Sequence, residues 1–169
     1  MAGRPRADSW TRAKSIIDNQ AQPPLTGGSA LEKGEAMEQI LSPTSKPIKV
    51  PGPDHPITIE RNPNRVVVSV AGRVIANTRD ALTLRESTYP PVQYIPRADV
   101  DLALLERTDH TTYCPYKGDC AYFSIPAGGA RSVNAVWTYE APFAAVSAIK
   151  DHLAFYPGRV DAIDERPGD

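Results

Sequence analysis

The sequence RVVVSVAGRVIANT, at residues 65–78, decides the fold class of this chain. Two runs rich in valine and isoleucine flank Ala71-Gly72, and this pattern favours two β-strands joined by a tight turn. On either side, ITIE at 57–60 and ALTLRE at 81–86 alternate apolar and polar residues, as a half-buried strand does. The middle of the chain is therefore predicted to be antiparallel β-structure.

Further short strands are predicted toward the end of the chain, at 92–96, 111–114, 120–125, 132–140 and 159–163. Residues 97–108 predict a short helical turn. Pro142 begins a predicted helix that gives way to a strand near Leu153. Seven or more short strands with turn signals between them indicate a mainly β domain, built as a sandwich or an open barrel.

Residues 1–50 have a different composition, with five prolines, four glycines, one aromatic residue and a net charge of +2. Two helix-like segments lie within them, DSWTRAKSIIDNQ at 8–20 and SALEKGEAMEQIL at 29–41. Each begins with a capping residue and carries an apolar stripe that is too small to be buried alone. We predict an N-terminal helical extension at 1–50, which could hold a homo-oligomer together, followed by a β domain at 51–169.

The bulk composition is that of a soluble globular protein, with 41% hydrophobic and 23% charged residues and a net charge of −1. The part from residue 51 has 12 basic and 15 acidic residues, so nucleic acid is not an expected partner. No apolar run approaches the roughly 18 residues of a membrane helix. Two cysteines are too few for a disulfide scaffold, and we expect a cytoplasmic protein with reduced thiols and no membrane contact.

The stretch TTYCPYKGDCAYF, at residues 111–123, holds both cysteines. A structural zinc site needs four ligands in paired knuckles, whereas Cys114 and Cys120 are separated by five residues and there is no second pair. Structural zinc is therefore not expected. The two thiols flank a turn and could face each other across a hairpin, so redox chemistry at Cys114 is one hypothesis; two small apolar residues in a hairpin are the simpler interpretation.

The turn in this stretch exposes Lys117 and nearby backbone N–H groups, which could form a small anion-binding nest. It lacks the glycines and the helix of a phosphate-binding P-loop. Nucleotidyl transfer would also require carboxylates to hold Mg²⁺ against the phosphates, and Glu86 and Asp99 are the candidates. The simpler interpretations are a solvated turn lysine for Lys117 and a helix cap for Asp99.

Tyrosine and tryptophan gather in the C-terminal two thirds of the chain. Trp137 and Tyr139 alternate along one strand and point to the same face. A face with such residues could line a small-molecule pocket, or form a core in which the hydroxyl groups find backbone partners.

Four motifs occur in one order, YPPVQYIPRADV at 89–100, TTYCPYKGDCAYF at 111–123, VWTYEAP at 136–142 and HLAFYPGRVDA at 152–162. Over about residues 57–164 the chain resembles domain-of-unknown-function family 427, which has also been labelled nucleotidyltransferase-like. The resemblance implies a small β domain whose two antiparallel sheets meet at an angle, like a tent.

From these observations we expect an uncharacterised small-ligand-binding domain, for a nucleotide or a phosphate compound, with transferase activity as its enzymatic form. Glu86, Asp99 and Lys117 are the predicted catalytic residues. The two carboxylates would bind a metal ion or act in proton transfer, with the cofactor unknown and Mg²⁺ one candidate. The predicted ligand contacts are Tyr94, Cys114, Tyr122, Trp137, Tyr139 and Tyr156. A non-catalytic binding or oligomerisation module and a thiol enzyme using Cys114 are the alternatives.

Overall fold

The computed structural model describes residues 45–168, and the helices predicted within 1–44 lie outside this range. The described chain forms ten β-strands and five short 3₁₀ helices. The strands are β1 (Ile57–Arg61), β2 (Arg65–Val70), β3 (Arg73–Thr78), β4 (Leu82–Glu86), β5 (Val92–Pro96), β6 (Glu106–Cys114), β7 (Gly118–Ser124), β8 (Val136–Thr138), β9 (His152–Phe155) and β10 (Ala162–Arg166). The helices are η1 (Arg97–Asp99), η2 (Leu102–Leu104), η3 (Pro126–Ser132), η4 (Ala144–Ile149) and η5 (Pro157–Arg159).

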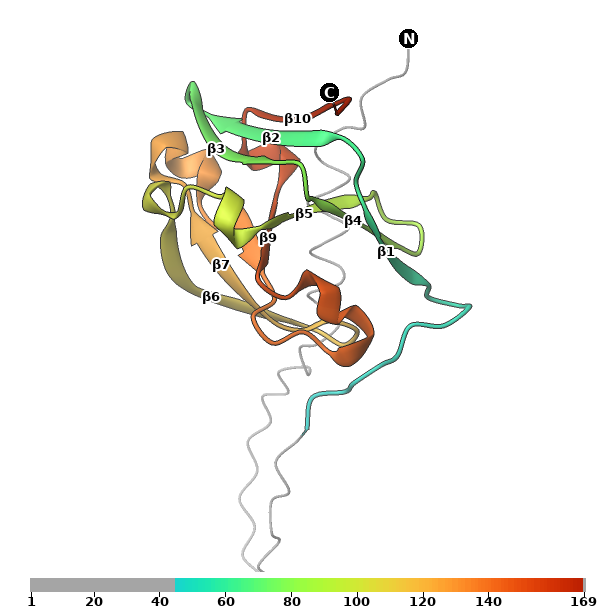
Figure 1. The fold of residues 1–169 in the computed structure, drawn as a ribbon. Coiled ribbons are helices and arrows are strands. Elements are labelled where there is room, and N and C mark those ends of the chain that lie inside the picture. Colours follow the sequence, from blue (N-terminus) through green and yellow to red (C-terminus); the bar gives the residue numbers. More distant parts are fainter. Residues whose placement is uncertain (1–44, 169) are drawn as a thin grey trace, which may run out of the picture.

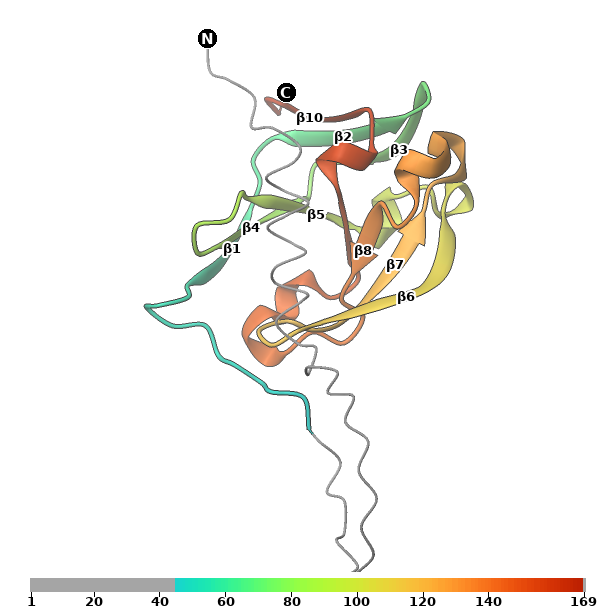
Figure 2. The ribbon, with the colours of Figure 1, turned by 180° about the vertical axis from the view of Figure 1, so that it is seen from behind.

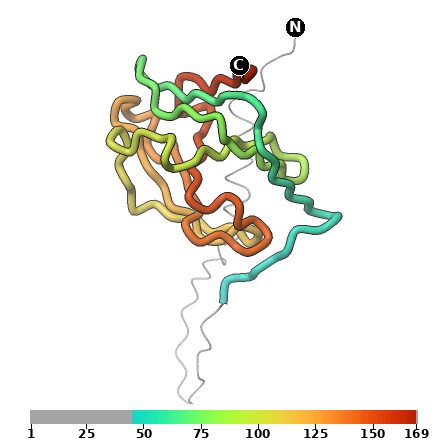
Figure 3. The backbone as a smooth tube through the Cα atoms, viewed as in Figure 1, coloured from blue at the N-terminus to red at the C-terminus, as the bar shows by residue number. Residues whose placement is uncertain are grey.

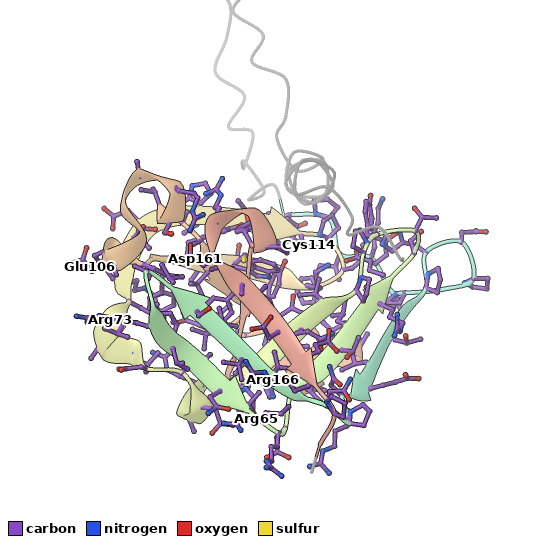
Figure 4. All side chains as sticks on the ribbon, turned by 90° about the horizontal axis from the view of Figure 1, so that it is seen from above. Arg65, Arg73, Glu106, Cys114, Asp161 and Arg166 are labelled. Atoms are coloured by element: carbon purple, nitrogen blue, oxygen red, sulfur yellow. The ribbon has the colours of Figure 1, made fainter. Side chains whose placement is uncertain are left out.

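The strands form two antiparallel sheets, so the predicted mainly β class is confirmed (Figure 1). Seven strands are ordered β1-β4-β5-β9-β8-β7-β6, and three are ordered β10-β2-β3. Figure 2 shows β6, β7 and β8 side by side in the larger sheet. Figure 4 looks onto the smaller sheet, where Arg65 and Arg166 lie together at one end because they are paired in the β2–β10 register. The tent-like angle between the sheets stays a prediction.

Two apolar cores lie on opposite faces of the central strands. The first core joins the larger sheet to the smaller one and includes Val68, Ile95 and Leu153. The second core lies on the other face and includes Tyr94 and Trp137. Neighbours along a strand point to opposite faces, so Ile95 enters one core and Tyr94 the other. Burial on both faces explains why the central strands are apolar almost throughout.

Several predicted elements shift in the structure. The predicted strand at 111–114 begins earlier, at Glu106, and the predicted strand at 132–140 is limited to Val136–Thr138. The predicted final strand at 159–163 lies at Ala162–Arg166, because Pro157 opens a 3₁₀ turn. Both segments predicted as helical form only 3₁₀ turns. None of the helices in residues 45–168 is long and apolar enough to cross a bilayer.

Candidate functional site

Glu86 is the last residue of β4, and the edge strand β1 fixes its position. Ile57 pairs with Glu86 at the end of the β1–β4 ladder. The N–H of Ser87 donates to the carbonyl of Pro56 at 2.8 Å, which extends this pairing by one step. The chain then turns back, with the N–H of Tyr89 donating to the carbonyl of Glu86 at 2.9 Å. The residues just before β1 are therefore held against the Glu86 side chain.

Lys117 comes from a different part of the chain, the turn between β6 and β7. Its N–H donates to the carbonyl of Cys114 at 3.2 Å, and its carbonyl accepts from the N–H of Phe143 at 3.1 Å. Gly118 follows with a φ of +107°, a conformation that glycine adopts without strain. Figure 3 shows this turn beside the loop that leads into η4. The local backbone thus aims Lys117 inward instead of toward solvent.

The two side chains meet as a buried ion pair. Lys117 Nζ donates to Glu86 Oε2, and their side chains are only 5% and 6% exposed. The expectation that Lys117 is an exposed turn lysine is therefore wrong. Three strands separate β4 from β7 in the sheet order, so this contact requires the larger sheet to curl around the second core.

His55 completes the cluster from the N-terminal arm, which we define as residues 45–55. A turn with reciprocal backbone bonds between Gly52 and His55, at 3.3 and 3.0 Å, sets the position of this histidine. His55 Nε2 lies 2.8 Å from Glu86 Oε1, and the imidazole ring stacks on Tyr116 with centroids 4.0 Å apart and planes 7° apart. The His55 side chain is 23% exposed, so it forms the boundary between the buried pair and solvent.

The surroundings keep Glu86 ionised. Burial raises the pKa of this carboxyl, but the charge and hydrogen bonds of Lys117, and those of His55, outweigh burial and leave the pKa below its ordinary value of 4.5. Ionised Glu86 can only accept hydrogen bonds, so Nε2 of His55 carries the proton that lies between them. The Glu86 carboxylate therefore receives a donor on each oxygen, one buried and one at the boundary with solvent.

The aromatic residues predicted to bind a ligand lie in the second core. Tyr94, Tyr122, Trp137 and Tyr139 are at most 1% exposed and Tyr156 is 6% exposed. Trp137 Nε1 donates to Tyr94 Oη at 3.2 Å, and burial raises the pKa of this tyrosine well above its ordinary value of 10.0. A ligand would reach these rings only by opening the core, and their role as ligand contacts stays a prediction.

Both cysteines also lie in the second core, with Cys114 fully buried. The prediction that they could face each other across the hairpin is wrong, because Cys114 lies opposite Gly118 and Cys120 lies opposite Thr112. The two thiols are not joined in a disulfide in the described chain.

Asp99 lies away from this cluster. It ends η1 and accepts from Thr78 Oγ1 at 2.5 Å, beside the smaller sheet. Leu84 pairs with Val92, so Glu86 lies beyond one end of β5 while Asp99 follows the other. A five-residue strand spans about 16 Å. The prediction that Glu86 and Asp99 could share one metal ion is therefore wrong, and among residues 45–168 no three His, Cys, Asp or Glu side chains gather as metal ligands.

A family model described as "Domain of unknown function (DUF427)" matches residues 58–166, well over half of the chain. The chain belongs to the DUF427 family. The predicted resemblance is confirmed. No curated protein matches the chain. The arm with His55 lies just before the stretch that the DUF427 model covers.

Sequence reasoning named Glu86 and Lys117 in this DUF427 domain but not His55 or Tyr116. His55 lies between Asp54 and Pro56 in a proline-rich stretch that matches no chemical motif. Only the fold shows that this stretch returns to the β6–β7 turn, so no local signal could have identified His55.

Proposed function

We propose that this DUF427 domain binds a small molecule through the carboxylate of Glu86, at the place where the arm meets the β6–β7 turn. The observation that carries the proposal is that the two oxygens of the Glu86 carboxylate accept from different donors. Buried Lys117 donates to one oxygen, and partly exposed His55 donates to the other. His55, itself 23% exposed, is bonded to one oxygen of this ionised, buried carboxylate.

A buried ion pair is poor evidence for a purely stabilising role. Desolvation of two charges is costly, and well-packed apolar residues of similar volume often give equal or greater stability. Charged groups with shifted pKa values occur preferentially at functional sites. Glu86 meets this description, because it combines burial, a charged partner and a lowered pKa.

The chemistry of the site defines what it can recognise. Glu86 would accept an N–H or O–H group of the ligand, and Lys117 would contribute positive charge to a phosphate or carboxylate nearby. A nucleotide or a phosphate compound meets both requirements. The donor set does not fit Mg²⁺, because Glu86 already accepts from Lys117 and His55 and Asp99 lies at the other end of β5. No step of this proposal passes through a metal ion.

Thermal unfolding of the full chain against nucleotides, nucleosides, sugar phosphates and thiol metabolites tests the proposal, each with and without Mg²⁺. A ligand at about 100 times its Kd raises the Tm by roughly 5–10 °C in a domain of this size. Glu86→Gln with Lys117→Gln should remove that shift. The matched control is Arg61→Gln with Asp80→Asn, which neutralises an exposed pair whose atoms are 2.5 Å apart. A panel without any shift would count against the proposal, and a shift seen only with Mg²⁺ would contradict the metal-free binding proposed for Glu86.

The two alternatives remain hypotheses with their own tests. An assembly module built on residues 1–50 predicts that the full chain sediments as an oligomer. A thiol enzyme predicts that Cys114→Ser removes whatever turnover accompanies ligand binding, although the thiol of Cys114 is fully buried.

A further inference from the structure

The imidazole of His55 is held in the way that proteins hold a flat, nitrogen-containing ligand. One face of the ring stacks on Tyr116, 4.0 Å away and nearly parallel. One ring N–H group donates to Glu86 at 2.8 Å. A ring face against an aromatic side chain and an edge N–H against a carboxylate are also the two contacts by which proteins bind nucleobases.

The arm that carries His55 is held to the rest of the domain by few contacts. All of residues 45–50 are exposed, so the arm adds little to either core. Besides the bond between His55 and Glu86, its polar contacts include one from the N–H of Lys49 to the carbonyl of Pro115 at 2.9 Å and one from Tyr113 Oη to the carbonyl of Pro47 at 2.7 Å. Lys46 also pairs with exposed Asp119. The arm can leave the β6–β7 turn without opening a core.

We infer that the position of His55 is a binding slot for a planar nitrogen heteroaromatic compound with an edge N–H donor, and that His55 is the occupant which such a ligand displaces. The inference rests on the proposed function, since it names the ligand class of the Glu86 carboxylate. Imidazoles and amino-substituted nucleobases such as adenine and cytosine belong to this class.

The same geometry sets the specificity of the slot. A flat ring without an N–H donor could stack on Tyr116 but would leave one oxygen of a partly buried carboxylate without a partner, which is costly. An aliphatic amine could reach Glu86 but would lose the stacking contact.

The first test empties the slot in the full chain with His55→Gly and adds imidazole at pH 8, where imidazole is neutral. Saturable binding and a rise in Tm are expected for this variant at lower imidazole concentrations than for the wild type, in which His55 competes for the slot. 1-Methylimidazole, which lacks the N–H group, should bind about tenfold more weakly or worse. Tyr116→Leu added to His55→Gly should remove most of the binding.

The matched control is His110→Gly, because the ring of His110 also contacts a tyrosine, Tyr122 at 4.5 Å, but has no carboxylate bonded to it among the described residues. If His55→Gly does not fold, His55→Ala serves in its place.

The second test uses the wild type with adenosine and cytidine. Displacement predicts that the NMR signals of the His55 ring shift and that hydrogen exchange at the Lys49 amide becomes faster.

Absence of imidazole binding to a folded His55→Gly or His55→Ala variant would overturn the inference, and the ligand panel on the wild type could still support the proposed function. Imidazole binding without any ligand in the wild-type panel would support the slot and count against the proposed function. Binding of adenosine with His55 signals unmoved would show that His55 is not displaced.

Discussion

Glu86 and Lys117 are 31 residues apart in the chain and form a buried ion pair. Glu86 ends β4 and Lys117 lies in the β6–β7 turn, so their contact joins the β1–β4 edge to that turn. The arm reaches the same point from the other side through His55. This pair therefore holds three separate segments of the fold together.

Removing one charge of the pair should destabilise the domain more than removing both. Glu86→Gln or Lys117→Gln alone leaves a charged group buried without its partner and should cost about 3–5 kcal/mol in the free energy of unfolding. Glu86→Gln with Lys117→Gln should cost less than either, because two neutral amides replace the ions. Urea unfolding of the four proteins gives the coupling energy as a double-mutant cycle.

The matched control for this cycle is the exposed pair of Arg61 and Asp80, with side chains 70% and 64% exposed. Its cycle should give no more than about 1 kcal/mol, since solvent screens an exposed pair. Equal coupling energies for the two pairs would show that the Glu86–Lys117 contact carries no special strength.

The lowered pKa of Glu86 predicts a stability that depends on pH. The folded-state pKa lies below the ordinary value of 4.5, so the unfolded chain binds the proton more readily. The contribution of Glu86 is therefore fully present above pH 4.5 and is lost as the pH falls through the folded-state pKa. Urea unfolding of the wild type and of Glu86→Gln with Lys117→Gln, from pH 7 to pH 3, should show the wild type losing more stability below pH 4.5.

The lowered pKa values of other carboxylates do not affect the difference in stability between these two proteins. Arg107 lowers the pKa of Glu140, and Arg131 lowers the pKa of Asp161, but both pairs are present in both proteins and cancel in the difference. A stability difference that stays constant down to pH 3 would contradict a lowered pKa for Glu86.

The predicted hairpin at 65–78 shows how far local sequence determines this fold. Its strands are Arg65–Val70 and Arg73–Thr78, and Ala71 and Gly72 adopt positive φ angles of 51° and 73°, as a tight turn requires. The register shift at Val68/Ser69 was not predicted, because a bulge depends on how the sheet packs and not on apolar alternation.

The candidate site is only partly predictable from the sequence, because its residues come from segments that are far apart in the chain. The sequence predicts Glu86 as a site carboxylate and Lys117 as the lysine of an anion-binding turn, but the burial of Lys117 depends on the curl of the larger sheet. Asp99 was grouped with Glu86 from residue type alone, and the β4–β5 register places it at the other end of β5. His55 comes from a proline-rich arm and contacts residues far along the chain. Glu86 is 31 positions away, and Tyr116 is further still.

The burial of both cysteines predicts thiols that react slowly in the folded protein. Cys114 and Cys120 are 0% and 2% exposed, so reagent reaches them only after local opening. An aromatic disulfide reagent should label the native chain at least about a hundredfold more slowly than the urea-unfolded chain. The variants Cys114→Ser and Cys120→Ser each leave one thiol, so they show how fast each cysteine is labelled. Fast labelling of Cys114 in the native protein would instead support a reactive thiol.

Gly118 should tolerate no side chain, because it follows Lys117 in a backbone conformation that L-residues rarely adopt. Its φ is +107°, and a Cβ at this position would lie 3.4 Å from the carbonyl oxygen of Ala141 and 3.8 Å from the Phe143 ring. Gly118→Ala should therefore cost about 1–3 kcal/mol in the free energy of unfolding. Gly72→Ala is the control, since its φ of +73° lies close to the left-handed helical region and no atom lies within 4 Å of its Cβ. Urea unfolding should show the larger loss for Gly118→Ala, and if the two losses are equal, the turn that aims Lys117 at Glu86 does not depend on this glycine.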